Sequence, residues 1–566
     1  MTTLDEMKKA MRQSNPTPTP TPTIASPDGL TASPGYQRSI LEASFNDTLT
    51  RAGDVTDSSR YFFIDITQLT GAMGNFFTEK VGPGNSIAQT IADVINRLAT
   101  THPAVTPVVR FLVGRDIQSE VSWSDLAKAY ADMFWPNGAP LVTNKKAVIY
   151  VAYYAPNFQP TGDTAKGRAN EIAPMIGTIG DHLRGIWNTF GGLLKVKNPD
   201  LSAAIVAVNS TTLMTGGGNF WSQYQANAHG IVDMQAKVKG DAAISAHPYC
   251  DYLWYTQKLE DRSDTRSVMG TTNLASQTKP TDKQWYDNTA APLFNRTPEA
   301  KEGIQVLTAA KLGDWFGPMY HIDYPVQLID ATRDLVLNIV WKIGATTKPD
   351  TMASFFKPAF NKLLTAVADS NTEMQARMKN LRITPAAWAS RIARNTAIKS
   401  AKKSIHISTE MFADFLMDGA SEWEKLVKNV NGKDDANSAI KLSWDGHLWG
   451  YDKTKISEYK TRLKDVMSCM FPEMNANDIS KLVGTKFRMR RILGGNSNSG
   501  GVHFNHCRTI CTDRKLLYVG SDNTYPSYNE EHGIWVDDAT AISNWYSGFW
   551  DTMWKKSDHD AHAADD

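Results

Sequence analysis

A histidine and an arginine lie two positions apart in His506-Cys507-Arg508, where an apolar segment begins near the C-terminus. If this segment is a β-strand, His506 and Arg508 point to one face and Cys507 to the other, because side chains alternate along a strand. An imidazole beside a guanidinium suits a phosphoryl group. Arg508 would neutralise the non-bridging oxygens, and His506 would attack phosphorus or transfer a proton. We therefore expect a phosphate-handling site here, with Cys507 and Cys511 in the core.

Further polar residues stand at the two turns that follow this segment. Asp513 falls at the first turn, where it can order a hairpin or hold the arginine. Ser521 and Asn523 fall at the next, glycine-containing turn and offer hydroxyl and amide donors. These residues extend the candidate site, with Ser521 and Asn523 as phosphate-binding groups.

The motif segment has a second copy in the N-terminal part of the chain. Residues 203–224 and 507–528 both run from an apolar strand through a polar turn to a second apolar stretch and a glycine turn. The polar turn residue is Asn209 in the first copy and Asp513 in the second, and Asn219 matches the asparagine of the second glycine turn. Each copy is typical of a β-hairpin.

The flanks of the two hairpins also repeat, as strands that alternate with helices. Strand patterns cover 60–69, 105–114, 230–240, 404–412 and 530–538, and helix patterns cover 86–100, 387–403 and 544–554. Alternation of this kind predicts α/β units. Two copies predict two similar domains related by a pseudo-twofold axis.

The second copy resembles a known signature. His-x-Arg-x4-Asp followed by Gly-Ser-x-Asn is similar to the HKD motif of the phospholipase D superfamily, whose usual form is His-x-Lys-x4-Asp. Asn529-Glu530-Glu531 resembles the Asn-x-Glu that follows in that family, so the resemblance implies that Glu531 orients His506 through its other ring nitrogen. The resemblance spans residues 58–556. It implies an α/β fold of two similar domains, each a mixed sheet flanked by helices, with the active site at the seam between them.

The chain departs from the family pattern in both copies. Arg508 replaces the usual lysine, which keeps the charge but adds a planar, bidentate donor. In the first copy, Ser202 stands where the histidine is expected, Ala204 at the lysine and Asn209 at the aspartate. Asp233 falls at the glutamate position. The first motif is therefore degenerate.

The resemblance implies a mechanism in which one histidine becomes a phosphohistidine and another protonates the leaving group, without a metal or organic cofactor. Three hypotheses follow for a chain with one such histidine: an enzyme with His506 as nucleophile, a site that only binds a phosphate-containing ligand, or two chains that pair their His506 residues, which ranks lowest. In the first hypothesis the acid is Ser202, a water molecule or one of five histidines elsewhere: His182, His229, His247, His321 and His406.

Composition limits the partners. The 566 residues carry 60 Lys and Arg against 59 Asp and Glu, a formal net charge of +1, which argues against a general polyanion binder and a stable nucleic-acid partner. The 4 Cys exclude a disulfide framework. No run of about 18 apolar residues is present, and the N-terminus lacks an apolar signal region, so we expect a cytoplasmic protein or one exported without a signal peptide. We expect a monomer, with peripheral membrane contact left open.

The predicted organisation has five parts. A Pro/Thr-rich tail over 1–35 is expected to be disordered, because alternating prolines suit neither helix nor sheet. The first domain covers 36–260, a polar connecting loop 261–300, the second domain 301–556 and a polar tail 557–566.

The sequence thus favours a phospholipase D-like phosphodiesterase or phosphatidyl-type transferase that acts on a phospholipid or similar phosphodiester through His506. Lipid is preferred because the bipartite length resembles the lipid-acting members. The alternatives are an impaired pseudoenzyme that binds a phosphate-containing ligand and a nuclease-type phosphodiesterase. Gly216-Gly217-Gly218 lacks the Lys-Ser/Thr of a nucleotide-binding loop. Trp545, Trp550 and Trp554 are predicted to lie on a helix that packs on the core.

Overall fold

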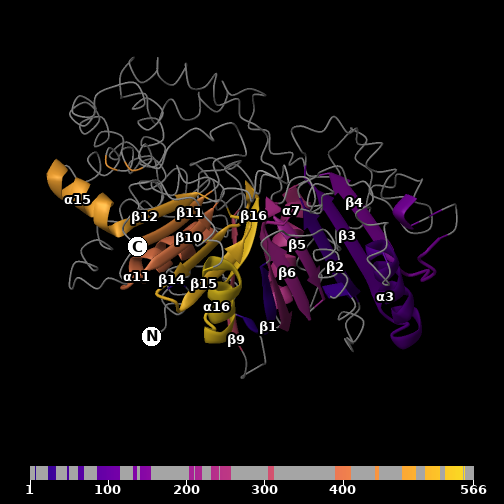
Figure 1. Ribbon diagram of the computed structural model, residues 1–566. Coiled ribbons are helices and arrows are strands. Elements are labelled where there is room, and N and C mark those ends of the chain that lie inside the picture. Colours follow the sequence, from indigo (N-terminus) through magenta and orange to yellow (C-terminus); the bar gives the residue numbers. More distant parts are fainter. Residues whose placement is uncertain are drawn as a thin grey trace, which may run out of the picture.

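The computed structural model is an α/β fold in which helices flank one large mixed sheet (Figure 1). The structure describes residues 7, 23–32, 48–49, 61–68, 86–114, 132–134, 136, 140–153, 203–209, 211–218, 231–240, 242–256, 304–311, 389–409, 440–444, 460, 464, 474–491, 504–522, 530–551 and 554.

The sheet has 14 strands, and its order reads almost the same from either edge: β12-β11-β10-β14-β15-β16-β9-β1-β8-β6-β5-β2-β3-β4. The N-terminal half contains β1 (Thr23–Ala32), β2 (Tyr61–Gln68), β3 (Thr106–Val113), β4 (Val148–Tyr153), β5 (Ala204–Val208), β6 (Thr212–Gly216) and β8 (Met234–Gly240). The C-terminal half contains β9 (Ile304–Lys311), β10 (Ile405–Thr409), β11 (Ile440–Trp444), β12 (Phe487–Arg491), β14 (Thr509–Thr512), β15 (Leu516–Gly520) and β16 (Glu531–Val536).

Strand directions repeat as well as strand order. In each half the three outermost strands are parallel, and every following pair toward the centre is antiparallel. The halves meet where β1 pairs antiparallel with β9, with Ala25 opposite Ile304. Two antiparallel strands are related by a twofold axis, so the whole sheet has the pseudo-twofold symmetry that the sequence repeat predicts.

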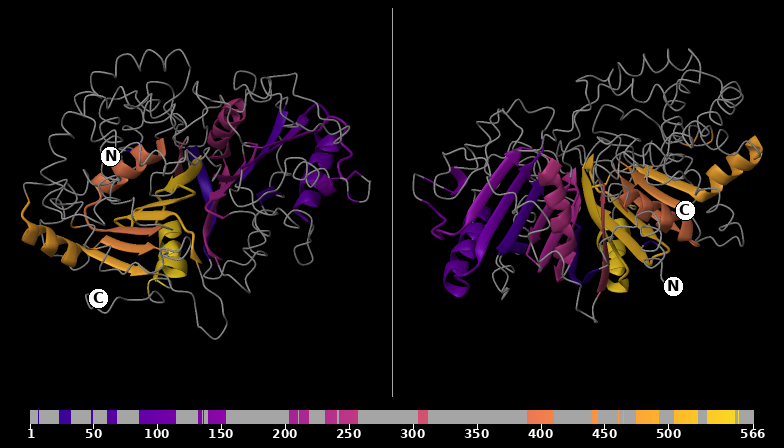
Figure 2. Two further views of the ribbon diagram at one scale, coloured as in Figure 1. Left: turned by 90° about the horizontal axis from the view of Figure 1, so that it is seen from above. Right: turned by 180° about the vertical axis from the view of Figure 1, so that it is seen from behind.

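Five described helices and one π-helical turn accompany the sheet: α3 (Ile87–Thr101), α7 (Ala242–Thr256), α11 (Ala389–Ser400), α15 (Ala476–Lys486), α16 (Ala539–Trp545) and η8 (Tyr546–Trp550). The expected strands and helices around both hairpins are confirmed. For example, α3 begins after Ser86, whose hydroxyl accepts the Gln89 backbone N–H at 3.2 Å, and it buries one apolar face on the outer strands of its half. α3 and α15 lie toward opposite ends of the sheet (Figures 1 and 2).

The prediction of a disordered tail over residues 1–35 is wrong for Thr23–Ala32, which form β1 at the centre of the sheet. Pro27 lies beside a register shift between Pro27 and Leu30, a bulge that lets the ladder pass a residue without a backbone N–H. The prolines of this segment signal an open chain, whereas its pairing depends on β8 and β9, which are distant in sequence. The loop predicted for 261–300 and the tail for 557–566 lie outside the described residues.

The two halves share one hydrophobic core. β6 and β8 of the first half contact β15 and β16 of the second, so the sheet folds over around the β1–β9 pair. α7 also contacts β9, and α16 contacts β1, so each helix reaches the central strand of the opposite half. Trp545, Trp550 and Trp554 are buried in this shared core, which confirms their predicted packing. None of the described helices is long and apolar enough to cross a membrane.

Candidate active site at the seam between the halves

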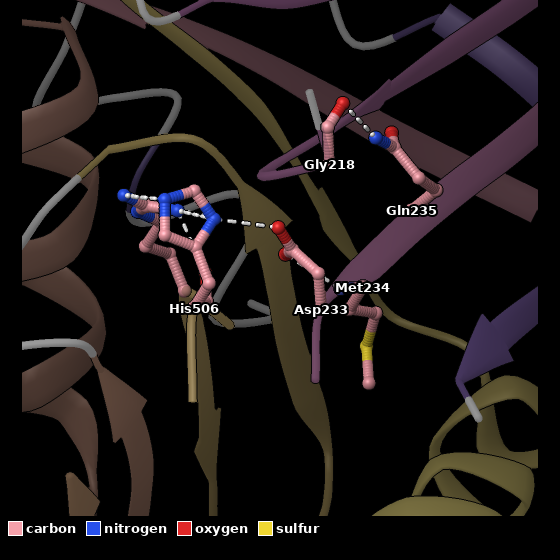
Figure 3. A network of polar contacts seen from close by, with 6 residues as sticks. Gly218, Asp233, Met234, Gln235 and His506 are labelled. Atoms are coloured by element: carbon pink, nitrogen blue, oxygen red, sulfur yellow. Dashed lines mark hydrogen bonds and ion pairs between the residues drawn. The ribbon is translucent and has the colours of Figure 1, made fainter. Parts of the chain in front are cut away.

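A short pair of strands brings the two halves together at one edge of the sheet. β7 (Ile231–Val232) and β13 (Phe504–Asn505) pair in parallel, so the residues that follow them, Asp233 and His506, leave the pair side by side. Figure 3 shows Asp233 and His506 pointing toward one another. The candidate site is therefore built by backbone pairing between segments that lie 273 residues apart in the chain.

The contact between these two side chains fixes the imidazole. His506 Nδ1 lies 2.6 Å from Asp233 Oδ2; the Asp233 side chain is fully buried, and the His506 side chain is 14% exposed. A carboxylate oxygen accepts hydrogen bonds, so this contact favours the tautomer that carries its proton on Nδ1. In that tautomer Nε2 keeps its lone pair, which is the form that a nucleophile or general base requires.

Arg508 lies against the same imidazole. Its Nη1 donates to the His506 carbonyl oxygen at 2.6 Å and lies 2.6 Å from His506 Nδ1, and its Nη2 lies 3.0 Å from His506 Nε2. Arg508 is 5% exposed, so its charge is held close to the ring with little water around it. The strand alternation predicted from the sequence is confirmed: His506 and Arg508 share a face, while Cys507 and Cys511 lie in the core.

The two cysteines have no catalytic character. Burial, together with Asp233, raises the pKa of the Cys507 thiol well above its ordinary value, although Arg508 opposes this shift. Burial raises the pKa of Cys511 to about 12. Both raised pKa values favour neutral thiols in the core.

Gly217 makes room for the cross-seam contact. A Cβ at this position would lie 2.5 Å from Asp233 Oδ1 and 3.0 Å from both Arg508 Nη1 and the His506 carbonyl oxygen. The glycine turn of the first half is thus required for close approach of the two halves. This function was missed in the sequence, where the three glycines were considered only as a possible nucleotide loop.

The role predicted for Glu531 is corrected by this geometry. The resemblance assigned to it the orientation of His506, but the carboxylate on Nδ1 is Asp233, from the opposite half. The strand register explains the exchange. Gly216 pairs with Gln235 in the first half, and Gly520 pairs with Gly533 in the second, so Asp233 and Glu531 occupy equivalent positions. Asp233 contacts the histidine of the facing half, which linear spacing does not reveal.

Asp513 also lies away from the reacting groups. It stands at the far end of β14, a strand that alone spans about 13 Å, and its carboxylate accepts the backbone N–H groups of Lys402, Lys403 and Ser404 at 2.7, 2.6 and 2.9 Å. Of the two roles considered for it, ordering the hairpin agrees with these contacts and holding the arginine does not. Its counterpart Asn209 has a similar left-handed backbone, with φ 42° against 54°.

The hydroxyl of Ser521 is engaged by the protein backbone. It accepts the His532 N–H at 3.1 Å and lies 3.3 Å from the His532 carbonyl oxygen, and Ser521 is 1% exposed. In this arrangement it holds the start of β16, and the phosphate-binding role predicted for it has no support from its contacts. Asn523 and Asn219, the other predicted phosphate ligands, lie outside the described residues.

The register confirms the alignment of the degenerate motif. Thr215 pairs with Ile205 and Val519 pairs with Thr509, so Ala204 is the counterpart of Arg508. Counting back two further positions makes Ser202, which lies outside the described residues, the sequence counterpart of His506. The first half therefore supplies Asp233 and Gly217 to the site but no cation at the motif position.

Two of the five histidines considered as the general acid make hydrogen bonds away from the candidate site. His247 lies between two acceptors, Asp65 Oδ2 at 2.5 Å and the Asn209 carbonyl oxygen at 2.8 Å, inside the first half. His406 bonds the Tyr546 hydroxyl at 2.8 Å and is 4% exposed. The remaining three, His182, His229 and His321, lie outside the described residues.

Sequence reasoning missed a polar contact in the seam itself. His532 Nδ1 lies 2.8 Å from the Thr215 hydroxyl of the opposite half, and the ring packs against Tyr249. Burial lowers the pKa of His532 to about 3, so its imidazole is neutral. A second missed contact joins Asp522 to Arg394 at 3.1 Å beside the glycine turn. Neither has a spacing signal, because both connect distant elements.

The chain matches no family model and no curated protein. Among solved structures, a phosphatidylserine synthase from Haemophilus influenzae Rd KW20 is 9% identical, with a TM-score of 0.45 over 99% of this chain and 93% of that chain. NucT from Helicobacter pylori is 14% identical, with a TM-score of 0.20 over 29% of this chain and 86% of that chain. The phospholipase D family member Nuc from Salmonella typhimurium is 17% identical, with a TM-score of 0.20 over 30% and 88%. Likenesses at these scores assign neither a family nor an activity.

Proposed function

We propose that this chain is a phosphodiesterase or phosphatidyl-type transferase that works through a covalent phosphohistidine on His506. The observation that carries the proposal is the contact of His506 Nδ1 with Asp233 Oδ2 at 2.6 Å, made across the seam with Arg508 against the same ring. A buried carboxylate on Nδ1, with a guanidinium against both ring nitrogens, prepares an imidazole for attack on an anionic centre.

The first step forms a bond from Nε2 to phosphorus and breaks the bond from phosphorus to the leaving alcohol oxygen. Asp233 stabilises the positive charge that develops on the ring, because it holds the Nδ1 proton. The leaving oxygen takes up a proton. In the second step the oxygen of water or of an acceptor alcohol attacks phosphorus, loses its proton and expels Nε2, which restores the neutral ring.

Arg508 acts before and during this step. In the free protein its Nη2 lies 3.0 Å from Nε2 and covers the lone pair. Phosphoryl oxygens of a substrate are better acceptors than a neutral ring nitrogen, so they would draw the guanidinium onto the phosphate and release Nε2 for attack. Substrate binding and activation of the nucleophile are thereby coupled.

The proposed substrate is a phospholipid, the class to which the two-domain resemblance in the sequence points. The near-neutral formal charge of +1 favours it over a nucleic acid, whose binding needs many phosphate contacts. The planar Arg508 guanidinium suits the oxygens of one phosphodiester.

A second candidate function is binding without turnover. The observation in its favour is Ala204, which stands at the position equivalent to Arg508 and leaves the first half without its motif cation. Such a site would still hold a phosphate through Arg508.

The test uses the full chain with vesicles of phosphatidylcholine and, in parallel, bis(p-nitrophenyl) phosphate. We expect turnover of both and a phosphorylated His506, detected by mass spectrometry after rapid quenching at alkaline pH, where phosphohistidine survives. His506→Ala should abolish both signals, a loss of at least about 10³-fold.

Turnover that survives His506→Ala would refute the assignment of His506 as the nucleophile. Vesicle binding without turnover, weakened by Arg508→Ala, would favour the binding protein instead. Cleavage of single-stranded or duplex nucleic acid, with a rate that falls steeply with salt, would favour a nuclease.

A further inference from the structure

The proposed function does not name the residue that protonates the leaving oxygen. The inference below rests on that proposed function. Cleavage of an alkyl phosphodiester needs a proton donor for the leaving oxygen in addition to the nucleophile. His506 and Asp233 form one cross-seam pair. On the opposite side of the pseudo-twofold axis, the first half has Ala204 where the second has Arg508.

The acid of that opposite side is nevertheless present. Glu531 occupies the position equivalent to that of Asp233. In the first half Gln235 pairs with Gly216, and in the second half Gly533 pairs with Gly520. Asp233 and Glu531 each lie two positions before that paired residue. Both acids are fully buried and stand where β8 and β16 begin, at the same edge of the sheet. The symmetry that puts Asp233 beside His506 therefore directs Glu531 toward the motif position of the first half.

The residue types on the two sides differ in a complementary way. In sequence, the counterpart of His506 is Ser202, whose side chain is much shorter than a histidine. Glu531 is one methylene longer than Asp233. Asp233 acts through an imidazole, whereas a longer carboxyl can exchange its proton directly, or through one water, with an oxygen bound at the seam.

We propose that Glu531 is the general acid for the leaving alcohol and the general base for the second step. In the first step the carboxyl O–H donates its proton to the leaving oxygen as the bond to phosphorus breaks, which leaves a carboxylate and a neutral alcohol. In the second step the carboxylate takes the proton of the attacking water or alcohol as the new bond to phosphorus forms and the bond to His506 breaks. Each turnover returns Glu531 to its starting form.

The Glu531 carboxyl acts electrostatically on a residue of the first half. Burial, together with Glu530, Glu531 and Asp522, raises the pKa of the Tyr249 phenol well above its ordinary value. Tyr249 belongs to α7, so this effect crosses from the second half to the first.

The test compares Glu531→Gln with a matched control, Glu530→Gln, which removes the neighbouring buried carboxyl at the position equivalent to Val232. Each variant is assayed on phosphatidylcholine, whose alkoxide leaving group needs a proton, and on bis(p-nitrophenyl) phosphate, whose phenolate does not. We expect Glu531→Gln to lose about 10²-fold or more on the lipid and less than about 10-fold on the aryl diester. Glu530→Gln should lose less than about 10-fold on both.

The pH profile gives an independent reading. An acid that must be protonated produces a fall in kcat at alkaline pH for the lipid, and Glu531→Gln should remove this fall, while Glu531→Asp should keep it at a lower rate. Ser202→His added to Glu531→Gln should restore part of the lipid activity by supplying an imidazole.

Several outcomes would overturn the inference. Equal losses on both substrates, with a lowered melting temperature, would make Glu531 a structural residue that supports the β16–β9 pair, where it lies opposite Lys311. An equal loss of lipid activity in Glu530→Gln would show that Glu531 has no role that its neighbour lacks. Turnover that needs His506 but ignores Glu531 would refute this inference alone, whereas turnover independent of His506, or none by the unaltered chain, would refute the proposed function and this inference with it.

Discussion

Just before β14 the second half carries His506 and Arg508, whereas the equivalent positions of the first half are Ser202, by sequence, and Ala204 at the start of β5. The backbone around both positions is the same: each hairpin pairs residue for residue, and each polar turn has a positive φ, 54° at Asp513 and 42° at Asn209. The halves have therefore kept one architecture while their chemistry has diverged.

The degenerate half remains necessary for the site of the intact half. Asp233 orients His506, and Gly217 leaves the space in which they meet. Because each half completes the other, loss of a motif in one half need not release its remaining residues from function. The comparison predicts that first-half residues which face the seam affect activity, while those in its interior affect stability.

The largest effect is expected from Asp233→Asn. The amide can donate to Nδ1 as well as accept from it, so the ring loses both its fixed tautomer and the charge that stabilises its cationic form. We expect kcat/KM to fall by about 10³–10⁴-fold with little change in melting temperature. Steady-state kinetics on the lipid and circular dichroism during heating check this. A fall of less than 10-fold would show that the second half works alone.

A large effect on stability is expected from Asp65→Asn in the interior of the first half. Asp65 accepts from Arg110 Nε and Nη2 at 2.5 Å and contacts His247, all with 1% exposure or less. The variant leaves Arg110 buried without its counter-charge, so we expect a loss of about 3–5 kcal/mol in the free energy of unfolding. Urea denaturation measures it.

The position equivalent to Asp65 gives the matched control. It is His406, since Asp65 pairs with Ala207 and His406 with Cys511 at corresponding points of β5 and β14. Tyr546→Phe removes the neutral hydrogen bond to His406 and should cost about 1 kcal/mol. Similar costs at the two positions would mean that the buried ion pair is not what distinguishes the first half.

The repeat explains how much of this structure could be predicted. The repeat between residues 203–224 and 507–528 predicted the two hairpins and the correspondence of Ala204 with Arg508, because strand alternation and turn residues are local signals. β1 was missed because its prolines and glycine indicate a loop, while its strand partners lie far away in sequence. The exchange of Asp233 for Glu531 on His506 was missed because it depends on how the halves dock.

A third prediction concerns one contact across the seam and the two positions that are equivalent to it. Thr215 and His532 meet in a hydrogen bond, and the residues at the equivalent positions are the apolar Val519 and Met234. Among the described residues His532 Nε2 makes no hydrogen bond. The polar pair therefore makes the seam sensitive to protonation in a way that its apolar copy is not.

The direction in which stability changes with pH follows from the pKa of His532, which burial lowers from 6.5 to about 3. Between these values the unfolded chain binds a proton and the folded chain does not, so stability is highest above about pH 6.5 and falls by about 1.4 kcal/mol per pH unit toward pH 3. The double variant His532→Met with Thr215→Val copies the other side and should reduce this slope. Urea denaturation at pH 7 and pH 5 measures it, and an unchanged slope would assign the effect to other groups.

The smallest effect on activity is expected from Asp513→Asn, which gives the second half the turn residue of the first. An amide oxygen can still accept the Lys403 and Ser404 N–H groups, but the bonds lose their charge, so we expect a cost of about 1–2 kcal/mol in stability. Because the turn lies at the far end of β14 from His506, kcat should stay within about 2-fold of the unaltered chain at temperatures where both are folded. The reverse change, Asn209→Asp, should leave activity equally unaffected. A specific loss of kcat in Asp513→Asn would instead mean that this turn acts on the site, and that the hairpins of the two halves differ in function at both ends.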